Sequence, residues 1–240
     1  MLLHPKAGKH YLSNSKDISK NSVSVCAVIP FYNEKETLNI VLSETIKYVQ
    51  FIFAVNDGSD DASYNDNEES NIRFINLDRN YGKGKALSAG FSEAVSEGFE
   101  NIITLDADLQ HDPKYIPKLI EGLQSFDIVI GNRLNNLKGM PIQRRLSNTL
   151  TSFFLTVKTG QNILDSQCGY RAYKEKVLRK VKTDFSGFEA ESEILVKAAK
   201  KGFKIGFVDI PTIYGNEKSK MRPVQAIVGF LRVLFSNTKN

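Results

Sequence analysis

The sequence predicts an α/β protein with a mostly parallel central sheet and helices on both faces. Three observations predict this fold class. Short runs of β-branched and apolar residues alternate with longer segments whose apolar residues recur at helical spacing. Several runs end in acidic or amide residues, as expected where ligands bind at the carboxyl ends of parallel strands. The 240 residues, of which 41% are hydrophobic, are enough for one large domain.

Composition restricts the partners that we expect. The formal net charge of +5 is small and the basic residues are gathered in a few places, which favours local anion sites over a nucleic-acid surface. No window approaches 18 apolar residues and the N-terminus lacks a signal-peptide pattern, so we expect any membrane contact to be peripheral. Cys26 and Cys168 lack metal-binding spacing, and we expect them to be free thiols in a reducing cytoplasm.

The chain begins with a polar arm and then a strand, a loop and a helix. Residues 1–22 are rich in Lys, Ser and Asn without periodicity, and we expect them to be flexible. Residues 23–29 are continuously apolar and predict a buried strand, which Pro30 ends before a helix over residues 38–49. A second strand over residues 50–55 leads into an acidic turn that could present carboxylates to a ligand. A plain solvated turn explains that stretch alone at least as well.

The next segment joins a strand to a helix through glycines and lysines. A strand is predicted over residues 72–77 and a helix over residues 86–97, with Arg79–Lys85 between them. Glycines and lysines at a helix N-terminus suit a bound phosphate. The segment does not match a Walker A loop, so by itself it is weak evidence for one.

An acidic cluster follows the apolar strand predicted over residues 102–105. Side chains alternate along an extended chain, so Asp106 and Asp108 would project the same way with Cα atoms roughly 6.6 Å apart, and Gln110 would continue the row if the chain stays extended. These hard oxygen ligands suit Mg²⁺ or Mn²⁺, which could hold nucleotide phosphates. Capping of a helix is the alternative, and we adopt it for Asp112, which precedes a proline. Capping needs one side chain, so we favour the metal for the other two carboxylates.

The second half predicts further helices and strands and a basic, apolar tail. Helices are expected over residues 114–124, 142–157 and 189–201, strands over 127–130 and 203–210, a loop over 134–141 and a polar turn over 165–171. The apolar segment 224–235 either packs on the domain or lies in a membrane interface beside the basic residues Lys218, Lys220, Arg222 and Arg232.

Five motifs, taken together, resemble family 2 glycosyltransferases. They are Val28–Glu34, Val55–Ser59, Asn80–Gly84, Asp106–His111 and Cys168–Arg171. They occur in the family's order and are most similar to the dolichyl-phosphate or polyprenyl-phosphate mannosyl- and glucosyltransferase branch. The resemblance implies a GT-A domain over residues 23–220. The apolar residues of the tail predict a C-terminal amphipathic or apolar helix over residues 221–240.

The resemblance also implies roles for individual residues. Those implied to bind the nucleotide sugar are Pro30, Tyr32, Glu34, Asp57, Lys83 and Asp106. Those implied to bind the metal are Asp106, Asp108 and Gln110. Those implied to bind an acceptor phosphate are Arg133, Arg144 or Arg145, Ser147 and Lys220, and Asp106, Asp108 and Arg133 would be catalytic. Asn56 replaces a commonly acidic position, which leaves the nucleobase open, and the spacing does not distinguish the two adjacent arginines.

The resemblance implies an inverting, metal-dependent transfer of a hexose from a GDP-mannose or UDP-glucose type donor to a polyprenyl phosphate. Because a phosphate has a second pKa of about 6, it is mostly ionised at pH 7 and needs no general base. A sugar or lipid hydroxyl, the alternative acceptor, would need one, and the candidates are Glu189, Glu191 and Glu193. For Glu189 we favour an ordinary surface role at a helix start.

A third possibility is a catalytically silent subunit that binds a nucleotide sugar within a membrane complex. The acidic cluster argues against it, because a protein that only binds has no need of that metal. We therefore expect an enzyme of cell-envelope glycan synthesis on the cytoplasmic face of a membrane, with a possible membrane-protein partner and no nucleic acid.

Overall fold

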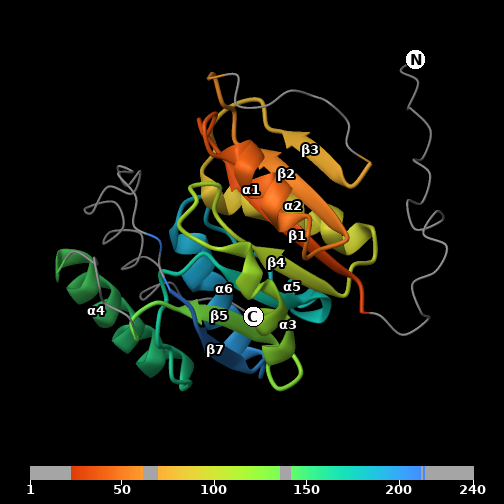
Figure 1. Ribbon diagram of the computed structural model, residues 1–240. Coiled ribbons are helices and arrows are strands. Elements are labelled where there is room, and N and C mark those ends of the chain that lie inside the picture. The colour runs from red at the N-terminus through yellow and green to blue at the C-terminus, as the bar shows by residue number, and fades with distance from the viewer. Residues whose placement is uncertain (1–22, 62–69, 136–141, 212, 214–240) are drawn as a thin grey trace, which may run out of the picture.

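The computed structural model describes residues 23–61, 70–135, 142–211 and 213, and its centre is a seven-stranded sheet (Figure 1). The strands are β1 (Val25–Phe31), β2 (Phe51–Asn56), β3 (Ile72–Asn76), β4 (Asn101–Thr104), β5 (Ile128–Asn132), β6 (Arg171–Lys174) and β7 (Ile205–Asp209). The helices are α1 (Leu38–Thr45), α2 (Lys83–Ser96), the 3₁₀ turn η2 (Pro113–Tyr115), α3 (Ile116–Gly122), α4 (Ile142–Thr159), α5 (Glu175–Lys180) and α6 (Glu189–Lys200).

The strand order is β3-β2-β1-β4-β6-β5-β7, and β6 alone runs against the others. The carboxyl ends of the other strands therefore meet at one edge of the sheet, together with the amino end of β6. The order reverses between β1 and β4, which is the position where open α/β sheets bind ligands.

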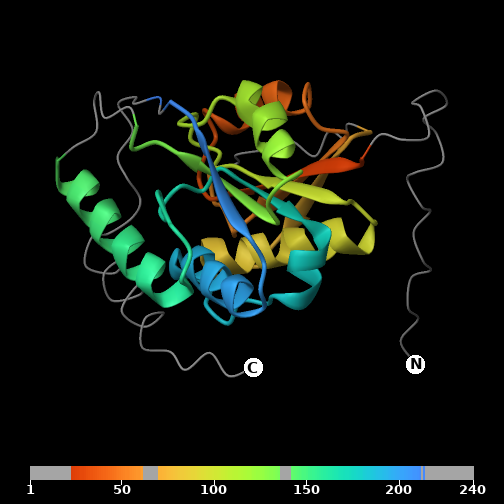
Figure 2. The ribbon, with the colours of Figure 1, turned by 90° about the horizontal axis from the view of Figure 1, so that it is seen from below.

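Helices cover both faces of the sheet (Figure 2), as predicted. Helices α1 and α3 lie on one face, and α2, α5 and α6 lie on the other. Strand β1 is buried along its whole length because it is apolar and has a neighbouring strand on each side. Close packing of α2 on the sheet depends on Gly90, where an added Cβ would lie 2.3 Å from Cγ1 of Val28.

Most predicted elements are present with small shifts of their ends, and the omissions lie around residues 171–180. The sequence predicts a polar turn up to Arg171, whereas this residue begins β6 and is fully buried. Helix α5 directly follows β6 and was not predicted either. Both elements are short, and β6 (Arg-Ala-Tyr-Lys) lacks the apolar run by which the other strands are recognised.

Two expectations about the whole chain can also be compared with the structure. Within the part of the chain that the structure describes, no helix is both long and apolar enough to cross a bilayer. Cys26 and Cys168 are free, as predicted, and both are buried. The predicted arm over residues 1–22 and the predicted helix over residues 221–240 lie outside the described residues.

Candidate active site

The loops that follow β1 and β2 are tied to each other at the carboxyl edge of the sheet. The backbone N–H of Asn33 donates to Oγ of Ser59 at 3.0 Å, and the N–H of Asp60 donates to Oδ1 of Asn33 at 3.1 Å. Asn33 has a φ of 52°, a left-handed conformation that Asn tolerates better than most residues. The two loops therefore form one unit beside the switch point.

Three of the residues implied to bind the nucleotide sugar lie at the start of this unit. Pro30 is buried within β1 opposite Val55 of β2, whereas Tyr32 and Glu34 are half-buried in the loop. The carboxylate of Glu34 accepts a hydrogen bond from Oγ1 of Thr37 at 3.2 Å. Pro30 therefore has a structural place in the sheet, and the other two side chains lie nearer the surface.

Asp57, just after β2, holds the glycine-rich loop that precedes α2. Its two carboxylate oxygens accept hydrogen bonds from the backbone N–H groups of Tyr81 and Gly82, both at 2.9 Å. Burial raises the pKa of Asp57, and these two hydrogen bonds oppose the rise only in part. The neighbouring Gly58 has a φ of 73°, and a Cβ there would lie 2.4 Å from the carbonyl carbon of Arg79. Asp57 thus holds the loop in place, and its implied role in nucleotide binding stays a prediction.

Lys83, the first residue of α2, joins two acidic side chains from other elements. Its Nζ lies 2.6 Å from Oδ1 of Asp106 and 2.9 Å from Oε2 of Glu191. Burial alone would lower the pKa of Lys83, but the two carboxylates outweigh burial and raise the pKa above its ordinary value. The predicted phosphate-binding lysine is therefore the cation of a three-residue cluster of Lys83, Asp106 and Glu191, which we call the Lys83 cluster.

Asp106, after β4, combines a charged partner with partial exposure. Its side chain is 31% exposed, and Gly169, which precedes β6, packs directly against it. A Cβ at Gly169 would lie 2.7 Å from both Oδ2 of Asp106 and Nζ of Lys83, so only glycine fits. Burial favours a raised pKa for Asp106, but the charges of Lys83 and Arg133 outweigh it and hold the pKa below its usual range. Asp106 is therefore ionised at neutral pH.

The chain bends after Asp106 and does not stay extended. Leu109 has a φ of 59°, and Oδ1 of Asp108 accepts a hydrogen bond from the backbone N–H of Gln110 at 3.1 Å. The condition under which Gln110 would continue the row, an extended chain, is therefore not met, because a turn closed by the side chain of Asp108 replaces it. The assignment of the three residues as metal ligands stays a prediction. Asp112, by contrast, caps η2 as predicted, since Oδ1 accepts from the N–H of Lys114 at 3.0 Å.

The oxygen atoms at this edge fit a divalent cation. Asp106 and Asp108 offer hard carboxylate ligands just after the carboxyl end of β4. Among the described residues, no three His, Cys, Asp or Glu side chains come together as a metal cluster. An ion here would therefore need further oxygen ligands, such as water or the phosphate groups of a bound molecule.

Arg133 lies just after β5 and is held by a buried carboxylate. Its Nε and Nη2 donate to the two oxygens of Asp165 at 2.8 and 2.9 Å. Asn148 of α4 donates to the same carboxylate at 2.6 Å. Burial favours a raised pKa for Asp165, but the hydrogen bonds and charge of Arg133 outweigh it and lower the pKa. The structure thus links α4 to Arg133 through Asp165.

The other residues implied to bind an acceptor phosphate lie on α4 or outside the described residues. Arg144 is half-buried, and one turn later Asn148 contacts Asp165. Ser147 is half-buried and accepts from Nε2 of Gln167 at 3.3 Å. Arg145 is exposed to solvent. Lys220 lies outside the residues that the structure describes.

The three glutamates of α6 that were candidates for a general base have different environments. Glu191 belongs to the Lys83 cluster, and Glu193 accepts from the N–H of Asp184 at 2.8 Å and pairs with Lys197 at 2.8 Å. Glu189 is half-buried in the first turn. Two of the three carboxylates are therefore occupied by structural partners.

Sequence reasoning missed Arg171, Asp165 and His111 as parts of the site. Arg171 is fully buried and donates to the carbonyl oxygens of Cys168, Ser166 and Glu191 at 2.7 to 2.9 Å. The ring of His111 lies 5.2 Å from that of Tyr170, and burial, the largest of several influences, lowers its pKa to about 4, so it is neutral at pH 7. A buried charged side chain needs hydrogen-bonding or charged partners, but no periodic pattern in the sequence showed that these three residues are buried at the site.

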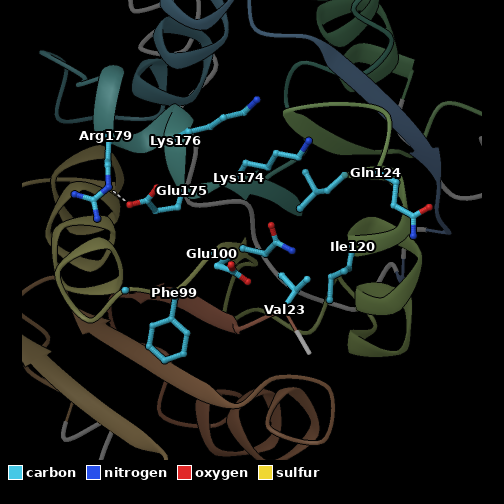
Figure 3. Close-up of a pocket in the computed structure, with 12 residues that line it drawn as sticks. Val23, Phe99, Glu100, Ile120, Gln124, Lys174, Glu175, Lys176 and Arg179 are labelled. Carbon is cyan, nitrogen blue, oxygen red and sulfur yellow. Dashed lines mark ion pairs between the residues drawn. The ribbon is translucent and has the colours of Figure 1, made fainter. Parts of the chain in front are cut away.

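A hollow of ≈ 660 Å³ lies at the opposite end of the strands (Figure 3). It is lined by residues at the amino end of β4 and the carboxyl end of β6, including Asn101 and Lys174. On its wall Arg179 pairs with Glu175. Because parallel sheets of this order bind ligands at the carboxyl edge, we do not assign the hollow to the site.

Comparison with known proteins agrees with this geometry. The model of "Glycosyl transferase family 2" matches residues 26–182. The UDP-N-acetylglucosamine–dolichyl-phosphate N-acetylglucosaminyltransferase of Methanococcus voltae is 31% identical over 228 residues, covering 85% of this chain and 90% of that protein. The undecaprenyl-phosphate mannosyltransferase of Micrococcus luteus is 28% identical over 219 residues, covering 85% of this chain and 89% of that one.

Solved structures share the fold. The glucosyl-3-phosphoglycerate synthase of Mycobacterium tuberculosis, crystallised with Mn²⁺, UDP and phosphoglyceric acid, superposes with a TM-score of 0.68 at 18% identity. The match covers 88% of this chain and 76% of that one. The likeness confirms the predicted GT-A architecture.

Proposed function

Because this chain belongs to glycosyl transferase family 2, we propose that it transfers a sugar from a nucleotide-diphosphate donor to a polyprenyl phosphate at the cytoplasmic face of a membrane. The two named relatives support the acceptor, since their names specify dolichyl phosphate and undecaprenyl phosphate. Their sugars differ, so the donor is proposed as a hexose-type nucleotide sugar, of which GDP-mannose and UDP-glucose are the first to test.

The observation that carries the proposal is the engagement of the candidate bases. A general base must reach the proton that it removes, and Glu191 instead contacts Lys83 while Glu193 contacts Lys197. An acceptor hydroxyl would lack their help. An acceptor phosphate is already mostly ionised at pH 7, because its second pKa is about 6. The site therefore suits a phosphate acceptor better than a hydroxyl.

We propose that the residues around Asp106 bind the donor and that the residues around Arg133 bind the acceptor. A divalent ion held by Asp106 and Asp108 would offset the negative charge that grows on the leaving diphosphate. The nucleotide would be bound by Tyr32 and Glu34 after β1, by Asp57 after β2 and by the loop before α2 that Asp57 holds. The acceptor oxygen would bond to the anomeric carbon as the bond from that carbon to the diphosphate breaks on the opposite face, which inverts the configuration.

Arg133 and Arg144 are proposed to hold the acceptor phosphate. The bidentate pair with Asp165 fixes the guanidinium of Arg133. The positive charge of Arg133 also helps to lower the pKa of Asp106. Arg144 precedes Asn148 by one turn and is half-buried, whereas Arg145 is exposed. We therefore assign the phosphate contact to Arg144 in preference to its neighbour.

Matched acceptors test the proposal. The full chain is incubated with Mn²⁺ and UDP-glucose, UDP-N-acetylglucosamine or GDP-mannose, with a short polyprenyl phosphate or the corresponding polyprenol. Mass spectrometry should find a glycosylated polyprenyl phosphate and no glycosylated polyprenol. Transfer to the polyprenol would favour a hydroxyl acceptor, and Glu189→Gln would then test the remaining base. Binding of a nucleotide sugar without transfer to either acceptor would favour a silent subunit.

A further inference from the structure

Lys83 contacts two carboxylates whose surroundings differ. Its Nζ lies 2.6 Å from Oδ1 of Asp106 and 2.9 Å from Oε2 of Glu191. The side chain of Asp106 is 31% exposed, whereas that of Glu191 is 7% exposed. A cation that arrives from solvent can therefore reach Asp106, while Glu191 is shielded from it. The two ion pairs of Lys83 should accordingly differ in how readily they exchange.

Glu191 is fixed by the buried Arg171. Nη1 of Arg171 donates to the carbonyl oxygen of Glu191 at 2.9 Å, and Nε lies 3.5 Å from Oε1 of Glu191. Arg171 also donates to the carbonyl oxygens of Cys168 and Ser166, so its guanidinium is itself held in place. Glu191 is therefore a fixed point of the Lys83 cluster, independent of Asp106.

Glu191 also has an oxygen with unused capacity to accept a hydrogen bond. Its Oε1 is buried and, among the described residues, accepts no hydrogen bond, because the contact with Arg171 is an ion pair without hydrogen-bond geometry. A buried oxygen without a hydrogen bond is unfavourable and uncommon in native proteins. An ammonium group has three donors, and the stem of a lysine is flexible. Lys83 could therefore turn away from Asp106 and bind both oxygens of Glu191.

A divalent cation at Asp106 would compete with Lys83. The proposed ion takes the same carboxylate that the ammonium contacts at 2.6 Å. Two cations on one carboxylate repel each other, so each disfavours binding of the other. Lys83 would have to loosen its contact with Asp106, and it then needs another anion within reach. Glu191 is such an anion.

We propose that Glu191 is a positioning residue, which retains Lys83 when a divalent cation takes Asp106. Glu191 acts through Lys83: it keeps the ammonium beside the site without leaving it on the metal ligand. The inference rests on the proposed function for the divalent cation and deepens the description of that site. It gives Glu191 a role that differs from that of a general base.

Binding of Mn²⁺ alone tests the proposal, with neither nucleotide nor acceptor present. The full chain is titrated, and free Mn²⁺ is measured from its electron paramagnetic resonance signal. The binding to be compared is the part that Asp108→Asn abolishes, because this part belongs to the proposed site. Glu191→Gln should weaken it by about tenfold, because Lys83 then depends on Asp106 alone and competes more strongly. Absence of any Mn²⁺ binding that depends on Asp108 would overturn the proposal.

The matched control is Glu193→Gln on the same helix. Glu193 is also buried and also pairs with a lysine, since Lys197 lies 2.8 Å from it. Its substitution should lower stability in a similar way and leave Mn²⁺ binding unchanged, because its described partners lie elsewhere. If Glu191 only stabilised the fold, the two variants would bind Mn²⁺ equally, and the proposal would be wrong.

Removal of the lysine shows whether Glu191 acts through it. Lys83→Met should bind Mn²⁺ about tenfold more tightly than the unaltered protein, because the competing cation is gone. In that background, Glu191→Gln should weaken Mn²⁺ binding by less than it does when Lys83 is present. An equal or larger loss would show that Glu191 acts on the cation directly, and weaker binding by Lys83→Met would refute the competition.

This inference and the proposed function can fail separately. Neither donor nor acceptor enters the Mn²⁺ measurements, so a protein that transfers no sugar can still show the difference between Glu191→Gln and Glu193→Gln. That outcome would defeat only the proposed transfer. Transfer to a polyprenyl phosphate together with equal Mn²⁺ affinities of the two variants would defeat only the inference about Glu191.

Discussion

Lys83 neutralises two acidic side chains that reach it from β4 and α6. Its side chain is 13% exposed, and its ion pairs at 2.6 and 2.9 Å span three elements that are distant in sequence. Breaking a buried ion pair leaves a charge without compensation, which costs more than the pair itself contributes. The lysine that the sequence suggested for phosphate binding is therefore also important for stability.

Lys83→Met should lower the free energy of unfolding by about 3 to 5 kcal/mol, because Asp106 and Glu191 then lose the cation that they share. Urea denaturation measures the change. The matched control is Lys85→Met, an exposed position on the same helix, which should change stability by about 0.5 kcal/mol or less. Equal effects of the two substitutions would show that the cluster does not stabilise the fold.

The adjacent arginines of α4 should differ in their effect on the acceptor. Arg144→Gln should lower kcat/KM for the polyprenyl phosphate. The loss should correspond to about 1.5 to 3 kcal/mol, the typical contribution of a hydrogen bond to a charged group. Arg145→Gln, at an exposed position, should have little effect on transfer to a short soluble acceptor. Kinetics at varied acceptor concentration distinguish them. A larger loss for Arg145→Gln would reverse our assignment.

The buried carboxylate of Asp165 should make stability depend on pH. Its pKa in the folded protein lies below its ordinary value of about 3.9, because Arg133 and Asn148 outweigh the effect of burial. The stabilisation is then complete above about pH 3.9 and is lost as pH falls through the folded pKa. The difference in unfolding free energy between the native protein and Asp165→Asn should be constant from neutral pH and shrink at lower pH. A difference that does not begin to shrink as pH falls below about 3.9 would contradict this.

At the scale of elements, sequence reasoning missed β6, the strand that lies between β4 and β5 and connects the two parts of the sheet. It pairs antiparallel with both β4 and β5, and Arg171 at its amino end faces Thr104 and Ile130. The buried strands β1 and β2 were predictable because both faces of each are covered and each is continuously apolar. A strand of four residues with a charge at each end has no such pattern, and its partners depend on residues some 40 to 70 positions away.

Arg171→Met tests how much β6 depends on its buried arginine. The substitution removes hydrogen bonds to three carbonyl oxygens and the contact with Glu191, and should destabilise the protein by about 3 to 5 kcal/mol. Lys174→Met, at the half-exposed end of the same strand, should cost about 1 kcal/mol or less. Thermal and urea unfolding of the two variants give the comparison. Similar losses would indicate that strand pairing alone holds β6.

At the scale of the whole molecule, the sequence indicated the fold class and the edge of the sheet where polar residues gather. It did not indicate which of these residues touch. Lys83 and Asp106 meet because α2 packs on β1, the neighbour of β4, and Glu191 joins them because α6 packs against α2. Local patterns also do not show turns such as the one at Leu109, which bends the chain between Asp108 and Gln110.

The antiparallel strand β6 also determines when the sheet can be completed as the chain is synthesised. Strands β1 to β4 pair through contacts that are all present once residue 104 has left the ribosome. Strand β5 has no partner among these four and can join them only after residues 171–174 emerge and fit between it and β4. During that interval both β4 and β5 offer an open hydrogen-bonding edge, the feature by which nascent β-proteins misassociate. About 70 residues, from the end of β4 to the end of β6, are therefore translated before the second half of the protein can fold onto the first. A chaperone bound to the nascent chain would protect the open edges while these residues are translated.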